Sequence, residues 1–374
     1  MILIRRFVIL IVCLLVLVGC VVLFQETFAN PPVGPQGEYR TQQEDVMMSR
    51  LLNTGVRGVN AGVTNGTYHR DAHPKSHGCV AAKFQVKALG WPYNQGLFVK
   101  PGIYDAWIRF SSGNPLIQSD WKPDARGMAI KVLAAVEQDF VMINNAVFML
   151  RDIEEYSEFG AYQAASAAEH KPLLAFKYFL LGPDNQATYN PFRWRLREFV
   201  LGVQILKWPP YSLLKTQFHS MTAYRMGSAG YIKFSARPVA CENQSEFDFG
   251  LVGFNKNALG EDLANRVKTG PYCFDFLIQP QRVDKNMPVE DPTVKWKESD
   301  SPFINAGRIK IDSQKISANP ENGFCEDLSF SPWQGYPEME PVGGLNRIRK
   351  VVYESISAYR HRMNGAEASH TKVQ

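Results

Sequence analysis

The sequence predicts an α+β fold in which antiparallel strands form a meander or a barrel and helices cover it. Short segments that alternate apolar and polar residues recur in the first half of the chain, with turn residues between them at 113–126. Longer segments with helical periodicity lie at 153–168 and 344–360. With 374 residues, 45% of them hydrophobic, the chain can bury a large core in one or two domains.

Each expected strand is rich in β-branched or aromatic residues and is bounded by turn residues. The expected strands are one that ends near Leu89, Ile103–Ser111, Met128–Leu133, Gln138–Asn144, Gly230–Ala236, Tyr272–Ile278 and Phe303–Ile311. Residues 280–302 are polar and begin and end with Pro, so we expect a loop there.

The expected helices carry apolar side chains at helical spacing and begin near capping or turn residues. They are Thr41–Leu52, Ile153–Ala168, Leu173–Leu181, Phe192–Leu206, Ala258–Val267 and Gly344–Arg360. The aromatic-rich helices at 173–206 are expected to pack in a core, because apolar helical stripes mostly do. A ligand channel and a membrane surface are the two other places in which they could rest.

The charge pattern excludes a nucleic-acid partner. Lys and Arg total 41 against 36 Asp and Glu, which gives a formal net charge of +5. The two signs are interleaved along the chain, as on a solvated surface, and no basic run forms a nucleic-acid footprint.

The N-terminus carries an export signal. Arg5 and Arg6 precede an unbroken apolar run, Phe7–Phe24, and positive charge on that side predicts that the following domain is exported. Residues 1–29 are therefore a signal anchor that is retained, or a signal peptide cleaved near Ala29. A third fate is lipidation at Cys20, in a sequence similar to a bacterial lipobox. Each places the domain on the exported, periplasmic side of the cell envelope, anchored in the membrane through residues 7–24 or secreted.

The remainder divides into a Pro- and Gly-rich linker at 30–40, one domain at 41–364 and a flexible tail at 365–374. Cysteine spacing excludes a zinc site or a redox dithiol, because none has C-x-x-C spacing. One or two disulfides and buried free thiols are both compatible with the four cysteines outside the export segment. These are Cys79, Cys241, Cys273 and Cys325.

The helix expected at 344–360 carries a Tyr between two Arg residues. Arg349 lies one turn before Tyr353, and Arg360 lies two turns after it. A nearby guanidinium favours a phenolate over a phenol, and tyrosinate is one of the known axial ligands of haem iron. Taken alone, the pattern is more typical of an amphipathic helix with solvated Arg residues.

A second informative stretch runs from Arg70 to Val86, from a loop rich in Pro and Gly into a strand. It contains His73 and His77. A His on a loop beside an Arg is a candidate for acid–base chemistry.

Five stretches in chain order resemble the catalase superfamily of haem proteins. They are Arg70-x-x-His73-x-Lys75, Arg109-Phe110-Ser111, Asp124-x-Arg126-Gly127, Asn144 with Val147-Phe148 and Arg151-Asp152, and Arg349-x-x-x-Tyr353 with Arg360. The chain is most similar to the small, catalase-related haem peroxidases, here with an N-terminal membrane or export segment. The resemblance implies a closed antiparallel β-barrel core with surrounding helices, and haem b between the barrel and the helix at 344–360.

The resemblance also implies an activity and the residues that perform it. The chain would decompose hydrogen peroxide or organic hydroperoxides, as a catalase or peroxidase, through an oxoferryl intermediate. Tyr353 would bind the ferric iron as a phenolate that Arg349 stabilises. His73 would move a proton between the peroxide oxygens, Ser111 would orient His73, and Asn144 would hydrogen-bond the peroxide.

The haem propionates would pair with Arg70, Arg109 and Arg360, whose forked guanidinium groups match carboxylates. Asp124 would lie in the channel to the haem, where its charge orients incoming peroxide. NADPH is not expected, because the added helical region that binds it in larger relatives has no counterpart here.

The chain departs from the family pattern at several positions. His73-Pro74-Lys75-Ser76-His77-Gly78 replaces the usual His-Ala-Lys-Gly, so His77 is a rival for the role of His73. The spacing from Arg70 favours His73. Ala125 stands in place of a Pro, and Met149 in place of a pocket Phe, where its thioether is open to oxidation.

Two other functions remain open at this point. The same fold supports isomerisation of fatty-acid hydroperoxides, as in allene oxide synthases. A haem-binding protein with little turnover is the other, although the retention of His73, Ser111 and Asn144 argues against it. The expected partners are a hydroperoxide, an organic reductant and the membrane, and the sequence is compatible with a homo-oligomer.

Overall fold

The computed structural model describes residues 37–365, apart from 42, 170, 172, 182–189, 191–192, 243–249 and 321–322. The predicted export segment, most of the linker and the tail from 366 onward lie outside the described residues. Within the described part of the chain, no helix has both the length and the apolar character that crossing a membrane requires.

Nine antiparallel strands form the sheet, in the order β5-β4-β3-β2-β1-β9-β8-β7-β6. An additional pairing of β5 with β7 closes eight of these strands into a barrel, and β6 extends the edge at β7. The strands are β1 (Ser76–Val86), β2 (Gly102–Ser112), β3 (Arg126–Val132), β4 (Gln138–Ile143), β5 (Phe218–His219), β6 (Tyr224–Arg225), β7 (Tyr231–Val239), β8 (Tyr272–Pro280) and β9 (Ile304–Ile311).

The closed barrel confirms the predicted fold class. The seven expected strands are all present, with ends shifted by a few residues, whereas β5 and β6 were not expected. The strand β5 closes the barrel although it has two residues, since His219 pairs with Ile143 of β4 and with Ser235 of β7.

Aromatic side chains fill the interior of the barrel. Phe84, Phe140, Phe234 and Phe276 come from four different strands and are fully buried. The ring centroids of Phe140 and Phe276 are 4.6 Å apart, and those of Phe140 and Phe234 are 5.1 Å apart. An eight-stranded barrel is just wide enough for its own side chains, so a flat cofactor must bind outside it.

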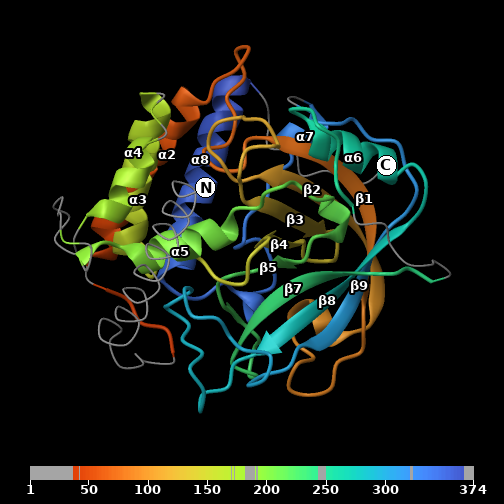
Figure 1. Cartoon of the computed structure of the whole chain (residues 1–374). Coiled ribbons are helices and arrows are strands. Elements are labelled where there is room, and N and C mark those ends of the chain that lie inside the picture. The colour runs from red at the N-terminus through yellow and green to blue at the C-terminus, as the bar shows by residue number, and fades with distance from the viewer. Residues whose placement is uncertain are drawn as a thin grey trace, which may run out of the picture.

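Most of the helices lie on one side of the barrel. Figure 1 shows α2, α3, α4 and α8 grouped beside it, with α6 and α7 near β1 on the other side. The helices are α2 (Glu44–Ala61), α3 (Ile153–Ala168), α4 (Leu173–Lys177), α5 (Leu196–Ile205), α6 (Ala258–Arg266), α7 (Phe324–Asp327) and α8 (Gly344–Asn364).

Three expected helices differ from the structure. The helix expected at Thr41–Leu52 begins at Glu44 and continues to Ala61 as α2. The segment expected as one helix from Leu173 to Leu181 divides into α4 and a short 3-10 turn at Tyr178–Leu180. The helix expected from Phe192 begins only at Leu196, and Phe192 itself lies outside the described residues. In these last two segments the apolar residues continue beyond the ends of the helix, so the sequence pattern did not show where each helix begins or ends.

The helix α8 presents one face to α2 and another to the barrel. Ile348, Val352 and Ile356 form a buried stripe that packs with α2 and α3. Gly55 of α2 allows this approach, because a Cβ there would lie 2.9 Å from Ile356 Cδ1. The neighbouring face of α8, which carries Tyr353, is left to face the barrel.

Two disulfides decide between the alternatives left open for the cysteines. Cys79 bonds to Cys325, and Cys241 bonds to Cys273. The first bond joins β1 to α7, so it fixes the segment that leads into α8 against the barrel.

Candidate functional site between the barrel and α8

Arg349 and Tyr353 form a hydrogen-bonded pair on α8. Arg349 Nη2 donates to Tyr353 Oη at 3.3 Å, and its Nη1 donates to Asn346 Oδ1 at 3.1 Å. Asn346 in turn donates to the carbonyl of Ala223 and fixes the start of α8 to the barrel. Burial opposes the charge of Arg349, but Tyr353 and Tyr224 outweigh burial and raise its pKa.

His73 lies on the loop before β1 and bonds to β2. Its Nδ1 is 3.0 Å from Ser111 Oγ. The backbone at His73 is left-handed, with φ of 58°, a conformation that few residues other than Gly adopt. Arg109 Nη2 holds this conformation in place by donating to the carbonyls of His73 and Pro74, at 3.1 and 3.3 Å.

The alternation of β2 explains why these side chains meet. Ile108 and Phe110 point into the barrel and are fully buried in its core. Arg109 and Ser111 therefore share the outer face, because successive residues of a strand point to opposite sides. In β3, Gly127 pairs with Ser111 and leaves room above it.

The His73 imidazole packs closely against Gly127, which has no side chain to displace it. A Cβ at this position would lie 2.7 Å from His73 Nδ1 and 2.8 Å from Ser111 Oγ. We expect Gly127→Ala to displace the imidazole and to slow any reaction that needs it by about 10²-fold, the usual cost of a misplacement of about 1 Å.

The matched control is Gly90→Ala, because a Cβ at Gly90 meets open space. Both variants are compared by initial rate and by thermal unfolding. If Gly127→Ala keeps the rate of the parent, His73 does not act from the position described.

Several positive groups surround His73. Burial, followed by the charges of Arg109, Arg349 and Arg70, lowers the pKa of His73 to about 3. The imidazole is therefore neutral at neutral pH and is able to accept a proton. Arg349 of α8 is thus close enough for its charge to act on His73.

Three arginines converge on one carboxylate beside the site. Glu326 Oε2 lies 2.7 Å from Arg70 Nη1 and 3.7 Å from Arg109 Nη2, and Glu326 Oε1 lies 3.4 Å from Arg360 Nη1. Burial raises the pKa of Glu326, but the positive charges of Arg70, Arg109 and Arg360 outweigh burial and lower it to about 2.

The cluster keeps an excess of positive charge. One glutamate neutralises one of the three guanidinium groups, and Arg109 Nε is buried without a hydrogen-bond partner. Burial and Arg70 lower the pKa values of both Arg109 and Arg360. A ligand with two carboxylates would supply the missing negative charge.

His77, the rival of His73, occupies a different place. It is fully buried in β1, where its Nε2 lies 2.9 Å from Ser112 Oγ and its Nδ1 lies 3.9 Å from Asp120 Oδ1. Burial, followed by Arg126 and Lys75, lowers its pKa. Its surroundings are those of a structural residue of the barrel wall.

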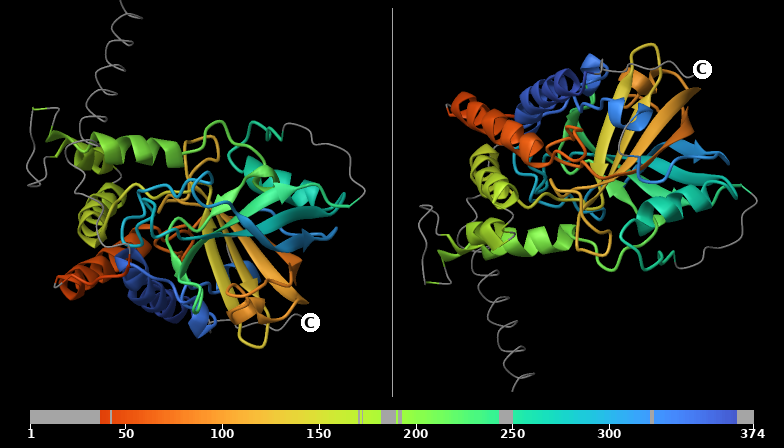
Figure 2. Two further views of the ribbon diagram at one scale, coloured as in Figure 1. Left: turned by 90° about the horizontal axis from the view of Figure 1, so that it is seen from below. Right: turned by 90° about the horizontal axis from the view of Figure 1, so that it is seen from above.

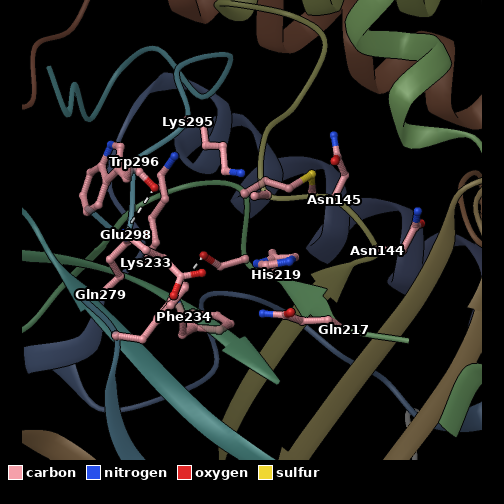
Figure 3. A pocket seen from close by; sticks show the side chains of 14 residues that line it. Asn144, Asn145, Gln217, His219, Lys233, Phe234, Gln279, Lys295, Trp296 and Glu298 are labelled. Atoms are coloured by element: carbon pink, nitrogen blue, oxygen red, sulfur yellow. Dashed lines mark hydrogen bonds between the residues drawn. The ribbon is translucent and has the colours of Figure 1, made fainter. Parts of the chain in front are cut away.

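Asn144 directly follows β4, and backbone groups hydrogen-bond to its side-chain amide. The Oδ1 accepts from the N–H of Arg126, and Nδ2 donates to the carbonyl of Ile205 at 2.8 Å. Asn144 also lines a separate cavity of about 230 Å³. Figure 3 shows Asn144 at one side of that cavity and Trp296 and Glu298 at the other. The second hydrogen of Nδ2 is left for a ligand.

The sequence did not point to three residues of the site. Glu326 follows Cys325 in α7 with no pattern that marks it. Burial raises the pKa of Asp71 to about 6, and burial, followed by Asp71 and Tyr353, raises that of Tyr156. Asp71 lies in the same stretch as His73, and this position could have identified it as a site residue. Tyr156 has no such sequence feature and resembles any core residue of α3.

Asp124 is buried, and its carboxylate accepts hydrogen bonds from residues of its own loop. Its Oδ1 accepts from the N–H of Asn114 at 3.0 Å, and its Oδ2 accepts from Gln118 Nε2 at 3.1 Å. Burial raises the pKa of its carboxyl group.

Comparison with known proteins identifies similar chains. The family model described as catalase matches residues 69–370. A catalase-related peroxidase of Mycolicibacterium paratuberculosis (strain ATCC BAA-968 / K-10) is 26% identical over 264 residues, which cover 67% of this chain and 76% of that protein.

Solved catalases share the fold. A fungal catalase gives a TM-score of 0.58 at 18% identity, covering 92% of this chain and 66% of its own. A bacterial catalase gives 0.55 at 17% identity, covering 89% and 63%. Catalase A of Saccharomyces cerevisiae gives 0.51 at 17% identity, covering 90% and 67%. The chain thus spans about two thirds of the length of these catalases.

Proposed function

The chain belongs to the catalase family, and on that premise we propose that it binds haem b between the barrel and α8 and decomposes hydrogen peroxide or organic hydroperoxides. One observation supports this most strongly. His73 is hydrogen-bonded to Ser111 of the barrel, Arg349 is hydrogen-bonded to Tyr353 on α8, and the charge of Arg349 acts on His73. The first pair can move a proton, and the second can present a phenolate to a metal.

The residues present fit a haem. Its two propionates match the two positive charges that Glu326 leaves unneutralised in the cluster of Arg70, Arg109 and Arg360. The buried, unpartnered Arg109 Nε is a donor of the kind that a carboxylate would satisfy. Tyr353 offers an oxygen ligand of the type known for haem iron.

The chain's own residues handle the protons. When bound, haem supplies the ferric iron and the redox chemistry that cleaves the O–O bond. His73, neutral because of its surroundings, accepts the proton from one peroxide oxygen and returns it to the other, which leaves as water from hydrogen peroxide or as an alcohol from an organic hydroperoxide. Ser111 orients the imidazole through Nδ1, and Asn144 has one amide hydrogen for a peroxide oxygen.

The low pKa of His73 fixes the expected pH dependence. A proton acceptor works in its neutral form, and His73 loses that form only as the pH falls toward about 3. We therefore expect the rate of peroxide decomposition to stay level between pH 8 and pH 5, where an ordinary histidine would become protonated. A pH–rate profile of the haem-loaded protein checks this. A fall in rate with a midpoint near the ordinary histidine pKa would contradict it.

The proposed reaction is tested with the full chain loaded with haem. Hydrogen peroxide consumption and oxygen release are followed together, with and without an oxidisable dye. Release of one oxygen per two peroxides identifies a catalase, and dye oxidation without oxygen identifies a peroxidase. If a haem-loaded sample neither releases oxygen nor oxidises the dye, the proposal is overturned.

We further propose that the domain works on the exported side of the cell envelope. The Phe7–Phe24 run and the two disulfides support this location, because disulfides persist in oxidising compartments.

A further inference from the structure

Three segments that are neighbours in space form an exposed apolar surface. We call it the 121–254 surface; its segments are 113–124, 203–211 and 250–257. Both views of Figure 2 place them along one edge of the molecule. The exposed or half-exposed side chains that form it are Trp121, Leu206, Trp208, Tyr211, Leu251 and Phe254.

A ring stack, a hydrogen bond and a β-bridge hold the three segments together. Trp121 and Phe254 stack with ring centroids 4.7 Å apart, and Trp121 Nε1 donates to the carbonyl of Gly253. Tyr211 forms a β-bridge with Leu251. Phe254 is nevertheless 92% exposed and Trp208 is 63% exposed. Single exposed apolar residues are ordinary, but a contiguous group marks an interaction surface.

The exposed charged side chains of the three segments are lysines, and Glu261 borders the surface through a hydrogen bond from Asn255. Lys122, Lys207 and Lys256 are exposed within it. The carboxylates of the same three segments, Asp120 and Asp124, are buried, and Asp120 is paired with Lys75. The surface therefore combines exposed Trp, Tyr and Phe with exposed Lys and shows no exposed carboxylate within these segments.

We propose that the 121–254 surface docks on an anionic lipid bilayer. Trp and Tyr favour the membrane–water interface, where one end of the ring is apolar and the other is wet. Lys residues beside them are attracted to anionic lipid headgroups. The same chain carries the apolar run Phe7–Phe24, which we expect to hold the domain at a membrane. A second copy of the chain is the alternative occupant.

Hydrogen bonds connect the surface to residues of the proposed catalytic site. Asn144 donates to the carbonyl of Ile205, whose neighbour Leu206 is exposed in the surface. Lys75, two residues after His73, donates to the carbonyls of Gln118 and Lys256. Docking would thus place the site next to the bilayer. If the proposed function holds, hydroperoxides of membrane lipids are the substrates best placed to reach it.

Hydrogen exchange of the full chain in vesicles tests the docking. The protein is reconstituted in vesicles of phosphatidylcholine alone and in vesicles that also contain phosphatidylglycerol. The apolar run can anchor the protein in vesicles of either composition. A difference in exchange between the two compositions therefore reports docking of the surface. We expect segments 113–124, 203–211 and 250–257 to exchange more slowly in the anionic vesicles.

Charge reversal supplies the matched variants. Each Lys near an anionic surface contributes about fivefold to binding, so Lys207→Glu with Lys256→Glu should lower the docked-to-undocked ratio by about 25-fold or more. The control is Lys87→Glu with Lys100→Glu. These two exposed residues lie beyond the end of β1 that is distant from His73.

The outcomes distinguish docking on an anionic bilayer from binding of a second copy of the chain. Protection that depends on phosphatidylglycerol and is lost in the first variant alone supports docking. Equal exchange in the two kinds of vesicle overturns it. Protection without vesicles that rises with protein concentration also overturns it, in favour of a second copy.

The consequence for the substrate has its own readout. Peroxidised phospholipid in the vesicles and hydrogen peroxide in solution are compared for the parent and the Lys207→Glu, Lys256→Glu variant. A rate loss for the lipid alone supports delivery from the bilayer, and equal losses for both peroxides contradict it. If the proposed function is wrong, neither peroxide is consumed, while the exchange result stands by itself.

Discussion

Replacing His73 with Asn is expected to slow peroxide decomposition by the haem-loaded protein by about 10²- to 10⁴-fold, the range that general acid–base catalysis contributes. Asn is chosen because it tolerates the left-handed backbone found at His73, with φ of 58°. It keeps a polar side chain near Ser111 but has no nitrogen that accepts a proton. The haem content and visible spectrum should change little, because the expected ligand lies on α8.

The matched control is His77→Gln. His77 bonds to Ser112 in the barrel wall and lies away from α8, so this variant should affect thermal stability and leave the rate per haem unchanged. Initial rates per bound haem compare the two variants. If His77→Gln is the slow variant and His73→Asn is not, the assignment of the proton carrier is reversed.

Replacing Glu326 with Gln is expected to destabilise the haem-free protein by about 3–5 kcal/mol, the usual result of leaving buried charges without their partner. Glu326 is the buried carboxylate that Arg70, Arg109 and Arg360 share. Haem would bring two propionates into the same cluster, so the loss should be smaller in the haem-loaded protein. Denaturant midpoints of both forms measure the difference.

Asp105→Asn serves as the control, because it removes a carboxylate that pairs with the exposed Lys83 and not with the arginine cluster. It should destabilise both forms slightly and equally. The Glu326 carboxyl has a lowered pKa of about 2, so its stabilisation is present above the unfolded value of about 4.3 and is lost as the pH falls toward 2. An equal loss in the haem-free and haem-loaded forms of Glu326→Gln would mean that the arginines do not bind the propionates.

The parts of the fold that could be predicted are those with a repeating pattern. The sequences of β2 and β3 alternate, β4 is a short run rich in Phe, Val, Met and Ile, and α8 has an uninterrupted helical period up to Gly365. The closing strand β5 could not be predicted, because two residues carry no period. The start of α5 was placed too early, since the apolar pattern around Phe192 does not show where the backbone becomes helical.

The candidate site shows the same division. His73, Ser111, Arg109, Arg349 and Tyr353 belong to local motifs. The structure brings His73, Ser111 and Arg109 into contact and pairs Arg349 with Tyr353. Glu326 has no motif, because its role depends on three arginines that come from the loop before β1, from β2 and from α8. The disulfide of Cys79 with Cys325 joins residues 246 apart in the sequence, a pairing that spacing could not decide.

The measurement that tests the central claim most directly is the visible absorption spectrum of the full chain, purified with haem supplied, beside the Tyr353→Phe variant. We expect a ferric high-spin spectrum in the parent and its change or loss in the variant, since phenylalanine offers the iron no oxygen. A parent that takes up no haem would contradict the proposed function. Identical spectra from the two proteins would mean that a residue other than Tyr353 holds the iron.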